Sequence, residues 1–464
     1  MMNVVIIGAG VAGLTLAHRL CKAGVHVVLV ERENAVGGLA RSLSYSNGAT
    51  FDTGPHRFRT EDSKVLAFVQ GILKDNYLWT NRNSKLFLFN RYLPWPLTLK
   101  SIFALPPRPL LRASLDLLLR QKARTDSFED YIIEKYGATL YRVFFQPYTE
   151  KFLHYRCGEV HRDWAVSGIS RATVDSQIDT TSLRALARSL LSPSPPQARF
   201  LYPQQGGIGA FADTLAAQLQ KNGTQILLSE TVAHFKEEGG RISAVRTTSG
   251  IEIPADFVFW SGSLVDLRRI GGAEESVPRL RYLSTILFNY TLNRPCPQSF
   301  QWCYFGGKDM KLDRVYLPRE FNPALVPQGK DTLGVELACY EDSDTWRDPG
   351  HLDRVVETFL LKARLLDSLD CIEECKVERL RETYPLYLLN YPQQLGAFLE
   401  WVHGKWRNLT PLGRTGRFWY NNMDHSIAAS LAVAERFLSD VARGAVQTGE
   451  AYAADDRHLT GRVQ

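Results

Sequence analysis

Two neighbouring stretches decide the fold class of this chain: VVIIGAGVAGLTLAHRL at residues 4–20 and VHVVLVE at residues 25–31. The first begins with four β-branched residues, which is typical of a strand buried on both faces. A G-x-G-x-x-G turn follows that strand and opens an apolar helix; its glycines are Gly8, Gly10 and Gly13. The second stretch is another apolar strand, and Glu31 ends it. The pattern therefore predicts a strand–helix–strand unit that binds a dinucleotide.

The residues of the glycine turn have separate physical roles. We expect Gly8 to permit the tight turn, Gly10 to let the backbone approach a pyrophosphate, and Gly13 to let the helix pack closely on the strand. Ala12 lies in the first helical turn, where unpaired N–H groups and the positive end of the helix dipole face the phosphates. Glu31 is expected to accept hydrogen bonds from a ribose 2′-hydroxyl, which disfavours NADP in this slot. The alternative is a glycine turn within a sheet that binds no ligand.

The segment ERENAVGGLARS, residues 31–42, distinguishes NAD from FAD. It supplies a glycine pair that ends at Gly38, then Leu39, and then Arg41 as a second contact for the pyrophosphate. This segment resembles the FAD-binding fingerprint of the glutathione-reductase-like flavoproteins, within the amine oxidase and protoporphyrinogen oxidase group. The resemblance implies an FAD cofactor. The alternative for Arg41 is an ordinary surface arginine.

The composition is that of a globular protein: 45% of the 464 residues are apolar and 22% are charged. The length predicts two domains. The net charge of +6 is mild, and the absence of a Lys/Arg run argues against nucleic acid as a partner. A mild positive charge does suit an anionic small-molecule substrate.

The cysteine pattern and the N-terminal residues predict a cytoplasmic protein. The seven cysteines show no paired spacing, so we expect reduced thiols. Cys371 and Cys375 are four residues apart, a spacing that would place them on one face of a helix without completing a metal site. The chain begins directly with a predicted strand, shows no signal-peptide pattern, and contains no apolar run long enough to span a bilayer. The sequence does not indicate an oligomeric state.

A second organised unit begins near residue 200. A glycine turn at 206–209 precedes an amphipathic helix and a strand, and two hairpin-like segments follow at 240–250 and 251–262. By resemblance to the same flavoproteins, Val232 would lie beside the adenine. We therefore expect a split Rossmann-like α/β domain with an inserted α+β substrate domain. The predicted boundaries are 1–60, 200–265 and 405–442 for the FAD domain, and 61–199 and 266–404 for the substrate domain.

The inserted regions carry three further predictions. Residues 127–153 are expected to form a helix, with Ser127 as N-cap and an aromatic cluster that is core rather than a ligand cage. Residues 283–341 alternate and are expected to form strands of one sheet. Residues 97–124 are apolar with interspersed arginines and lysine; they could contact a membrane surface, although a core helix with a solvated basic face is favoured.

Five segments of the chain resemble the UDP-galactopyranose mutases and the protoporphyrinogen-oxidase-like proteins near them. These segments are FDTGPHRF (51–58), FQPYTEKF (145–152), QWCYFGGKDMKLDR (301–314), ETYPLYLLNY (382–391) and GRTGRFWYNNMDHS (413–426). The resemblance of the first segment implies that Gly54 and His56 lie against the flavin. The resemblance implies a sugar-diphosphate pocket formed by Trp302, Tyr304, Arg314, Tyr384, Arg414 and Tyr420. Guanidinium forks and phenols are suitable groups for a diphosphate.

The resemblance stops at the nucleotide half of the pocket. The tryptophan that the mutases carry after their Pro-Tyr-x-x-Lys stretch falls on Leu153, an arginine falls on Gly168, and a uridine-contacting Tyr-Pro-x-Gln falls on residues 95–98.

Two mechanisms stay open. In the first, reduced flavin attacks a sugar anomeric carbon through N5, as the resemblance to the mutases implies. His56, Arg314 and Arg414 are then the catalytic residues, and an external reductant such as NAD(P)H keeps the flavin reduced. In the second, an oxidase or desaturase takes hydride from a small organic substrate.

The run Asp424-His425-Ser426 contains the residue types of a hydrolase triad, but adjacent residues do not converge as a triad requires. The run instead opens an apolar helix and carries capping residues. In the flavin family this helix start faces the ring end of the cofactor. We therefore expect Asn422, Met423, Asp424 and Ser426 to contact the flavin, where the helix dipole favours an anionic reduced ring.

Overall fold

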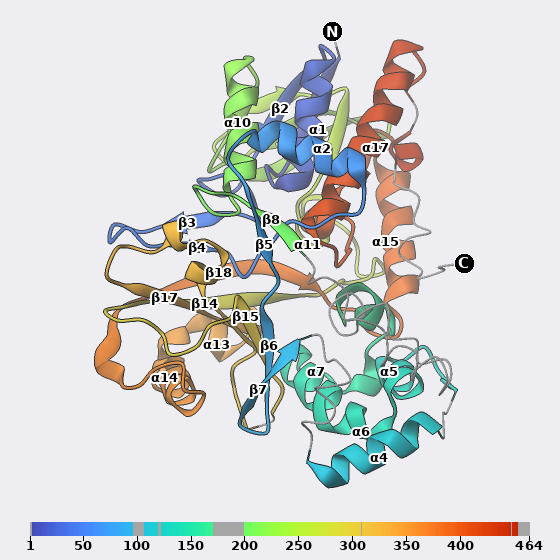
Figure 1. Ribbon diagram of the computed structural model, residues 1–464. Helices are drawn as coiled ribbons and strands as arrows, with labels where there is room; N and C mark the ends of the chain where they lie inside the picture. Colours follow the sequence, from blue (N-terminus) through green and yellow to red (C-terminus); the bar gives the residue numbers. More distant parts are fainter. Residues whose placement is uncertain are drawn as a thin grey trace.

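The computed structural model describes residues 2–95, 106–118, 122–169, 199–307, 309–446 and 448–452. In Figure 1 a parallel sheet and its helices form one end of the molecule, a large sheet forms the middle, and a group of helices lies beside that large sheet. The predicted α/β fold with an inserted α+β region is confirmed.

The parallel sheet has five strands, and each neighbouring pair is parallel. Their spatial order is β19 (Leu409–Pro411), β13 (Phe257–Trp260), β1 (Asn3–Ile7), β2 (His26–Val30) and β9 (Gln225–Leu227). Helices cover both faces, so the strands are apolar on both sides, as the sequence predicts. The main covering helices are α1 (Val11–Lys22), α2 (Ser63–Leu73), α10 (Ala210–Lys221) and α17 (Met423–Ala442).

All five of these strands fall within the three ranges predicted for the FAD domain, and the domain division itself stays a prediction. The hairpin-like segments near 240–262 form a small antiparallel sheet and then return to the parallel sheet through β13. That small sheet consists of β10 (Val232–Glu238), β11 (Arg241–Thr247) and β12 (Glu252–Pro254), and helix α11 (Leu264–Ile270) follows β13.

The large sheet has seven strands, and it confirms the strand pattern expected over 283–341. Its order is β18 (Ile372–Pro385), β14 (Tyr282–Leu292), β17 (Asp331–Cys339), β16 (Arg314–Tyr316), β15 (Trp302–Phe305), β6 (Ser84–Leu88) and β7 (Arg91–Trp95). One face packs against α14 (Asp353–Lys362) through an apolar cluster that includes Phe288 and Leu360. The alternate residues of the same strands face the loops of the parallel-sheet region, and they carry the polar groups of the candidate site.

Short elements connect these sheets. The strands are β3 (Ser42–Ser44), β4 (Thr50–Asp52), β5 (Leu78–Asn81) and β8 (Arg199–Tyr202), and the helices are α12 (Pro318–Phe321), α13 (Asp344–Arg347), α15 (Tyr391–Lys405) and α16 (Gly413–Gly416). β3 pairs with β4, and β5 pairs with β8.

The single helix expected over 127–153 is wrong in one respect: the segment is broken. It forms α5 (Phe128–Tyr136), α6 (Ala138–Leu140), a π-helical turn (Tyr141–Phe145) and α7 (Gln146–Leu153). The break lies at Gly137, whose φ of +85° a helix cannot continue. Ser127 is the N-cap, as expected: its Oγ accepts the Asp130 N–H at 3.1 Å.

Helix α4 (Pro107–Leu118) is the described part of the segment 97–124. Among its described side chains, Ala113 is 2% exposed, whereas Leu111 and Leu115 are 65% and 47% exposed, so the favoured interpretation of a core helix stays a prediction. Within the described ranges no helix is long and apolar enough to cross a membrane.

The helix expected to carry Cys371 and Cys375 is absent. Cys371 ends a short 3-10 turn and Cys375 lies in strand β18. All seven cysteines are free, and no group of metal ligands occurs among the residues that the structure describes.

Candidate cofactor and substrate site

The glycine turn forms a cradle in which side chains have no room. A Cβ at Gly13 would lie 2.0 Å from the Gly8 carbonyl oxygen, and Gly8 itself has a φ of +97°. Gly10 pairs with Gly37 across an isolated bridge, and a Cβ at Gly38 would meet the Gly10 Cα at 3.2 Å. No side chain caps helix α1, and its first turn, which contains Ala12, has no acidic residue. The backbone at this helix start is therefore open to an anion, as a dinucleotide pyrophosphate requires.

Glu31 lies at the end of β2 and is held from both sides. One carboxylate oxygen accepts the Ala9 N–H at 2.7 Å and the other accepts the Glu33 N–H at 2.9 Å. Burial raises the pKa of this carboxyl above its usual range. Each oxygen keeps a further lone pair, so the residue fits the predicted role as a ribose-hydroxyl acceptor.

Arg41 is not an ordinary surface residue. Its guanidinium lies 3.5 Å from the Glu33 carboxylate, and its Nε is buried without a hydrogen-bond partner. Such an orphaned donor beside the glycine cradle fits a phosphate contact. The neighbouring Leu39 carbonyl accepts the Thr53 hydroxyl at 2.8 Å, which ties this loop to strand β4.

The segment 51–58 is anchored by Asp52, whose carboxylate accepts three hydrogen bonds. The donors are the Ser42 hydroxyl (2.6 Å), the Tyr202 hydroxyl (2.5 Å) and the Ile208 N–H (3.0 Å). Burial raises the Asp52 pKa to about 6. This anchor fixes the loop that carries Gly54 and His56.

Tyr304, Arg314 and Glu336 are direct neighbours across strands β15, β16 and β17. Arg314 forms a two-pronged ion pair with Glu336 through Nε and Nη2, and Nη2 also donates to the Tyr384 hydroxyl at 3.3 Å. A Cβ at Gly54 would lie 2.4 Å from a Glu336 carboxylate oxygen, so this glycine lets the 51–58 loop approach the ion pair. Glu336 is not predictable from the sequence in the way that Arg314 is, because only the strand register makes the two residues neighbours.

His56 lies near both predicted anion-binding arginines. Its Nε2 donates to the Thr53 carbonyl at 3.1 Å. Burial, together with the positive charges of Arg314 and Arg414, lowers the His56 pKa to about 4. The three residues predicted to be catalytic are therefore brought within electrostatic reach of one another, and His56 is neutral at physiological pH.

Arg414 reaches the site from α16 and is held by the backbone. Nε and Nη2 donate to the Thr383 carbonyl at 3.1 and 2.7 Å, and Nη1 donates to the Asn421 carbonyl at 2.5 Å. Its guanidinium stacks 4.5 Å from the Tyr420 ring centroid and 5.1 Å from that of Tyr384. Among the described residues these are its hydrogen-bond partners, which leaves two of the five guanidinium N–H donors for an anion.

Trp302 is 1% exposed and belongs to an apolar cluster with Tyr316 and Phe321. Its contact with a substrate stays a prediction. The guanidinium of Arg57 lies over its ring at 4.3 Å from the centroid. Arg57 directly follows His56, yet no motif in the sequence distinguishes it from an ordinary arginine.

Aromatic side chains form one wall of the site. Tyr148 contacts Tyr304, and Trp164 stacks on Tyr420 with ring centroids 4.9 Å apart. Most of the aromatic cluster expected to be core is indeed buried, namely Tyr136, Tyr141, Phe144 and Phe145. Tyr148 is the member that reaches the site.

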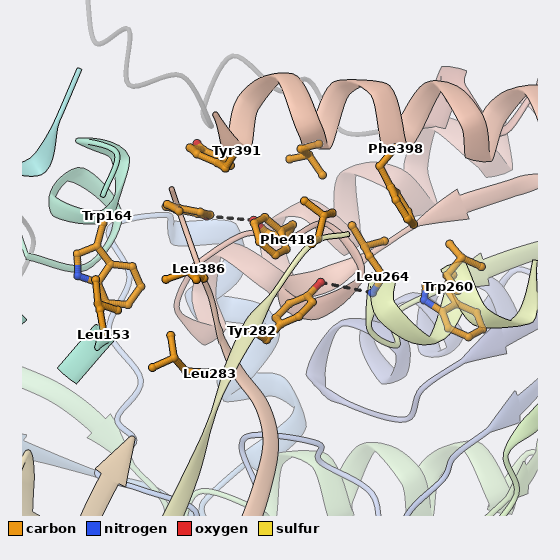
Figure 2. Close-up of a cluster of buried hydrophobic side chains, with 14 of the residues drawn as sticks. Leu153, Trp164, Trp260, Leu264, Tyr282, Leu283, Leu386, Tyr391, Phe398 and Phe418 are labelled. Carbon is orange, nitrogen blue, oxygen red and sulfur yellow. Dashed lines mark hydrogen bonds between the residues drawn. The ribbon is translucent and has the colours of Figure 1, made fainter. Parts of the chain in front are cut away.

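An apolar cluster supports the loop that carries Arg414 and Tyr420. Figure 2 shows Phe418 at its centre, between Tyr282, Leu264 and Tyr391. The Tyr387 hydroxyl donates to the Phe418 carbonyl at 3.1 Å and accepts the Tyr420 N–H at 2.8 Å. Phe418 has a φ of +52°, a left-handed conformation that this packing maintains.

The start of helix α17 is a capped helix end and not a triad, as predicted. Met423 is its first residue, and the N-cap Asn422 donates its N–H to the His425 Nδ1 at 3.4 Å. Ser426 pairs with Asn421, whose side-chain nitrogen donates at 3.0 Å. Asp424 lies 3.2 Å from His425. Contact of these residues with the flavin stays a prediction, as does contact of Val232 with the adenine.

A cavity of about 490 Å³ lies elsewhere, between the β6–β7 hairpin and residues 142–147. It includes none of the arginines or tyrosines described above. This cavity is therefore separate from the candidate site.

Comparison with known families gives the identity of the fold. The model of the family described as flavin containing amine oxidoreductase matches residues 11–280, more than half of the chain. The chain belongs to this family. It is therefore a flavin-dependent enzyme with FAD as cofactor and a small-molecule substrate, as the glycine cradle predicts.

The curated relatives include several flavin enzymes. A UDP-galactopyranose mutase from Mycoplasma pneumoniae is 36% identical over 74 residues, 16% of this chain and 18% of the relative. A phytoene desaturase from Fusarium fujikuroi is 22% identical over 392 residues, 72% of this chain and 65% of the relative. An L-amino-acid oxidase from Notechis scutatus scutatus is 31% identical over 150 residues, 29% and 28% of the two chains. Each alignment spans less than two thirds of the relative.

Solved structures extend the likeness to nearly the whole chain. A crystal structure of reduced UDP-galactopyranose mutase superposes with a TM-score of 0.81 at 20% identity, covering 99% of this chain and 98% of that chain. A putative protoporphyrinogen oxidase from Exiguobacterium sp. 255-15 gives 0.70 at 15% identity, covering 94% and 98%. These matches confirm the predicted fold and the predicted family resemblance.

Proposed function

We propose that this flavoenzyme acts on an anionic small molecule that carries a diphosphate, of the sugar-diphosphate class, without net oxidation of the substrate. One observation carries the proposal: Arg314, Arg414, Tyr384 and Tyr420 gather beside His56 on the face of the large sheet, with Glu336 as the carboxylate partner of Arg314.

The charges of these groups suit an anion. Glu336 neutralises Arg314, whereas no carboxylate pairs with Arg414 among the described residues. Burial lowers the pKa of the Arg414 guanidinium, but an arginine stays charged in proteins. The site therefore keeps excess positive charge, which an anionic substrate would neutralise. Phenol hydroxyls add donors to phosphate oxygens without adding charge.

The cofactor, when bound in its reduced form, would supply a nucleophilic centre. The chain's own residues would position the substrate: Arg414 and Tyr420 would hold its diphosphate, and the buried aromatic wall would exclude water. His56, neutral at physiological pH, would offer a hydrogen-bonding ring beside the flavin without adding a third positive charge. The N-terminus of α17 would favour an anionic ring end of the cofactor.

A second candidate is an oxidoreductase that takes hydride from a small organic substrate. It is favoured by the aromatic wall, from Tyr148 to Trp164, and by the desaturase alignment over 72% of the chain. For such chemistry the side chains need to provide little more than an apolar slot for the substrate.

The purified holoenzyme separates the two candidates. Under anaerobic conditions, dithionite-reduced enzyme is incubated with a panel of nucleotide sugars, and oxidised enzyme is incubated with amino acids, polyenes and porphyrinogens. We expect isomerised or transferred sugar from the reduced enzyme and no bleaching of the oxidised flavin. Arg414→Gln should abolish this conversion, whereas the exposed Arg347→Gln should keep it. Bleaching of the oxidised flavin by one of the organic compounds, with no sugar conversion, would overturn the proposal.

A further inference from the structure

Among the described residues, Arg57 differs from the other arginines around the site in having a ring contact but no hydrogen bond or ion pair. Arg314 is paired with Glu336, Arg414 donates to backbone carbonyls, and Arg59 is paired with Glu61 on the surface. The Arg57 guanidinium contacts the Trp302 ring, and no acceptor in the described part of the chain takes a hydrogen bond from it.

The surroundings of Arg57 make this isolation costly. The side chain is mostly buried, and it lies over Trp302. The groups that interact with it electrostatically are two phenols, Tyr304 and Tyr420, and two further arginines, Arg314 and Arg59. A ring face attracts a cation only weakly compared with a carboxylate. A partly buried charge without a carboxylate partner contributes little to stability, so a folding role does not explain it.

The position of Arg57 points to a role in binding an anion. Tyr420 interacts electrostatically with Arg414, and Arg57 interacts with the same Tyr420 and with Tyr304. Because Glu336 neutralises Arg314, Arg57 and Arg414 are, within the described ranges, the two arginines near these tyrosines that have no carboxylate partner. Two positive charges match the charge of a diphosphate diester near neutral pH.

We infer that Arg57 is a substrate-binding residue of this site, and that its guanidinium, stacked over Trp302, binds a phosphate of the substrate's diphosphate together with Arg414. This inference rests on the proposed function. It also gives Trp302 a role: the buried indole orients the Arg57 fork from beneath instead of touching the substrate.

The test measures binding and does not require turnover. Inorganic pyrophosphate is titrated into the FAD-loaded enzyme by calorimetry, for wild type, Arg57→Gln, Arg57→Lys and the matched surface control Arg59→Gln. We expect Arg57→Gln to weaken binding about 10- to 100-fold, the effect of losing hydrogen bonds to a charged group. Arg57→Lys keeps the positive charge but loses the two-pronged guanidinium, so its pyrophosphate affinity should lie between those of wild type and Arg57→Gln. Arg59→Gln should stay within about twofold, as an exposed pair.

A second readout excludes a merely structural role. Because the unpaired charge is removed, Arg57→Gln should raise the Tm of the ligand-free holoenzyme, so that affinity falls while stability rises. If wild type and Arg57→Gln bind pyrophosphate equally, Arg57 has no such role and the proposed function stands. If wild type ignores pyrophosphate but binds benzoate through Arg57, the diphosphate proposal fails and this assignment of Arg57 fails with it. Absence of binding to either anion overturns both.

Discussion

The two ends of the site are built in opposite ways. The phosphate end of the cofactor site consists of backbone: glycines leave room, and a helix start presents free N–H groups. The substrate end consists of side chains from distant strands, and most of these side chains already have protein partners. The backbone end therefore depends on the space that the glycines leave, whereas the side-chain end depends on how charged side chains are placed and paired.

The largest effect is expected where the backbone end loses its space. In Gly13→Ala the new Cβ would lie 2.0 Å from a backbone oxygen that cannot move aside. We expect the protein to lose FAD, seen as loss of flavin absorbance relative to protein absorbance. Gly396→Ala is the control: this exposed position in α15 has no atom within 4 Å of the new Cβ, so the change should add about 0.5–1 kcal/mol of stability. Full FAD content in Gly13→Ala would show that the cradle is not the phosphate site.

The next effect tests the charge balance of the substrate end. Glu336→Gln leaves Arg314 without its carboxylate, and we expect the free energy of unfolding to fall by about 2–3 kcal/mol, since the pair is largely buried. The freed guanidinium should also bind pyrophosphate more tightly. Glu373→Gln removes an exposed partner of Lys330 and should cost less than about 1 kcal/mol. Denaturant titrations measure both; equal losses would contradict the comparison.

The pH dependence of stability sharpens the comparison further. The pKa of His56 is about 4 in the folded protein, against 6.5 for a free histidine. Between pH 6.5 and pH 4 this histidine is therefore protonated in the unfolded chain but still neutral in the folded protein. The free energy of unfolding consequently falls as the pH is lowered from 6.5 towards 4. The loss should reach about 2–3 kcal/mol. In His56→Gln this loss should disappear, whereas exposed His26→Gln should follow wild type. Parallel curves of unfolding free energy against pH for wild type and His56→Gln would refute the assignment.

The smallest effect concerns the support behind the side-chain end. Tyr387→Phe removes the hydroxyl that bridges Phe418 and Tyr420, and we expect a loss of about 1–2 kcal/mol together with a higher KM. Tyr92→Phe removes a comparable bond to the Ala363 carbonyl on the other face of the sheet. It should lower Tm to a similar degree and leave KM unchanged. If KM rises in both variants, the Tyr387 hydroxyl does not act specifically by positioning Tyr420.

This contrast also explains which features could be predicted from the sequence. The glycine cradle is contiguous, and its spacing follows directly from helix and strand geometry, so the pattern alone predicts Gly8, Gly10 and Gly13 as its members. Glu336 meets Arg314 only through strand register, which residue spacing does not reveal. Arg57 was passed over for a related reason: its lack of a partner is a property of the folded neighbourhood.

Two local predictions failed because tertiary packing overrode spacing. Cys371 and Cys375 have helical spacing, yet Cys375 lies in β18, an edge strand of the large sheet that pairs with β14. The helix over 127–153 was expected to be continuous, but Gly137 breaks it where a Cβ would lie 2.6 Å from the Asp116 side chain. In both cases the local structure follows from contact with another segment of the chain and not from residue spacing.

The order of the parallel sheet bears on how the enzyme is made. β1 and β2 are separated along the chain from β19, the edge strand at residues 409–411, by all strands of the large sheet, and α17, which packs onto α1, lies further on still. A chain that stops before residue 409 would therefore carry the complete glycine turn but lack a strand and a helix that pack around it. We expect such truncated chains to bind FAD poorly.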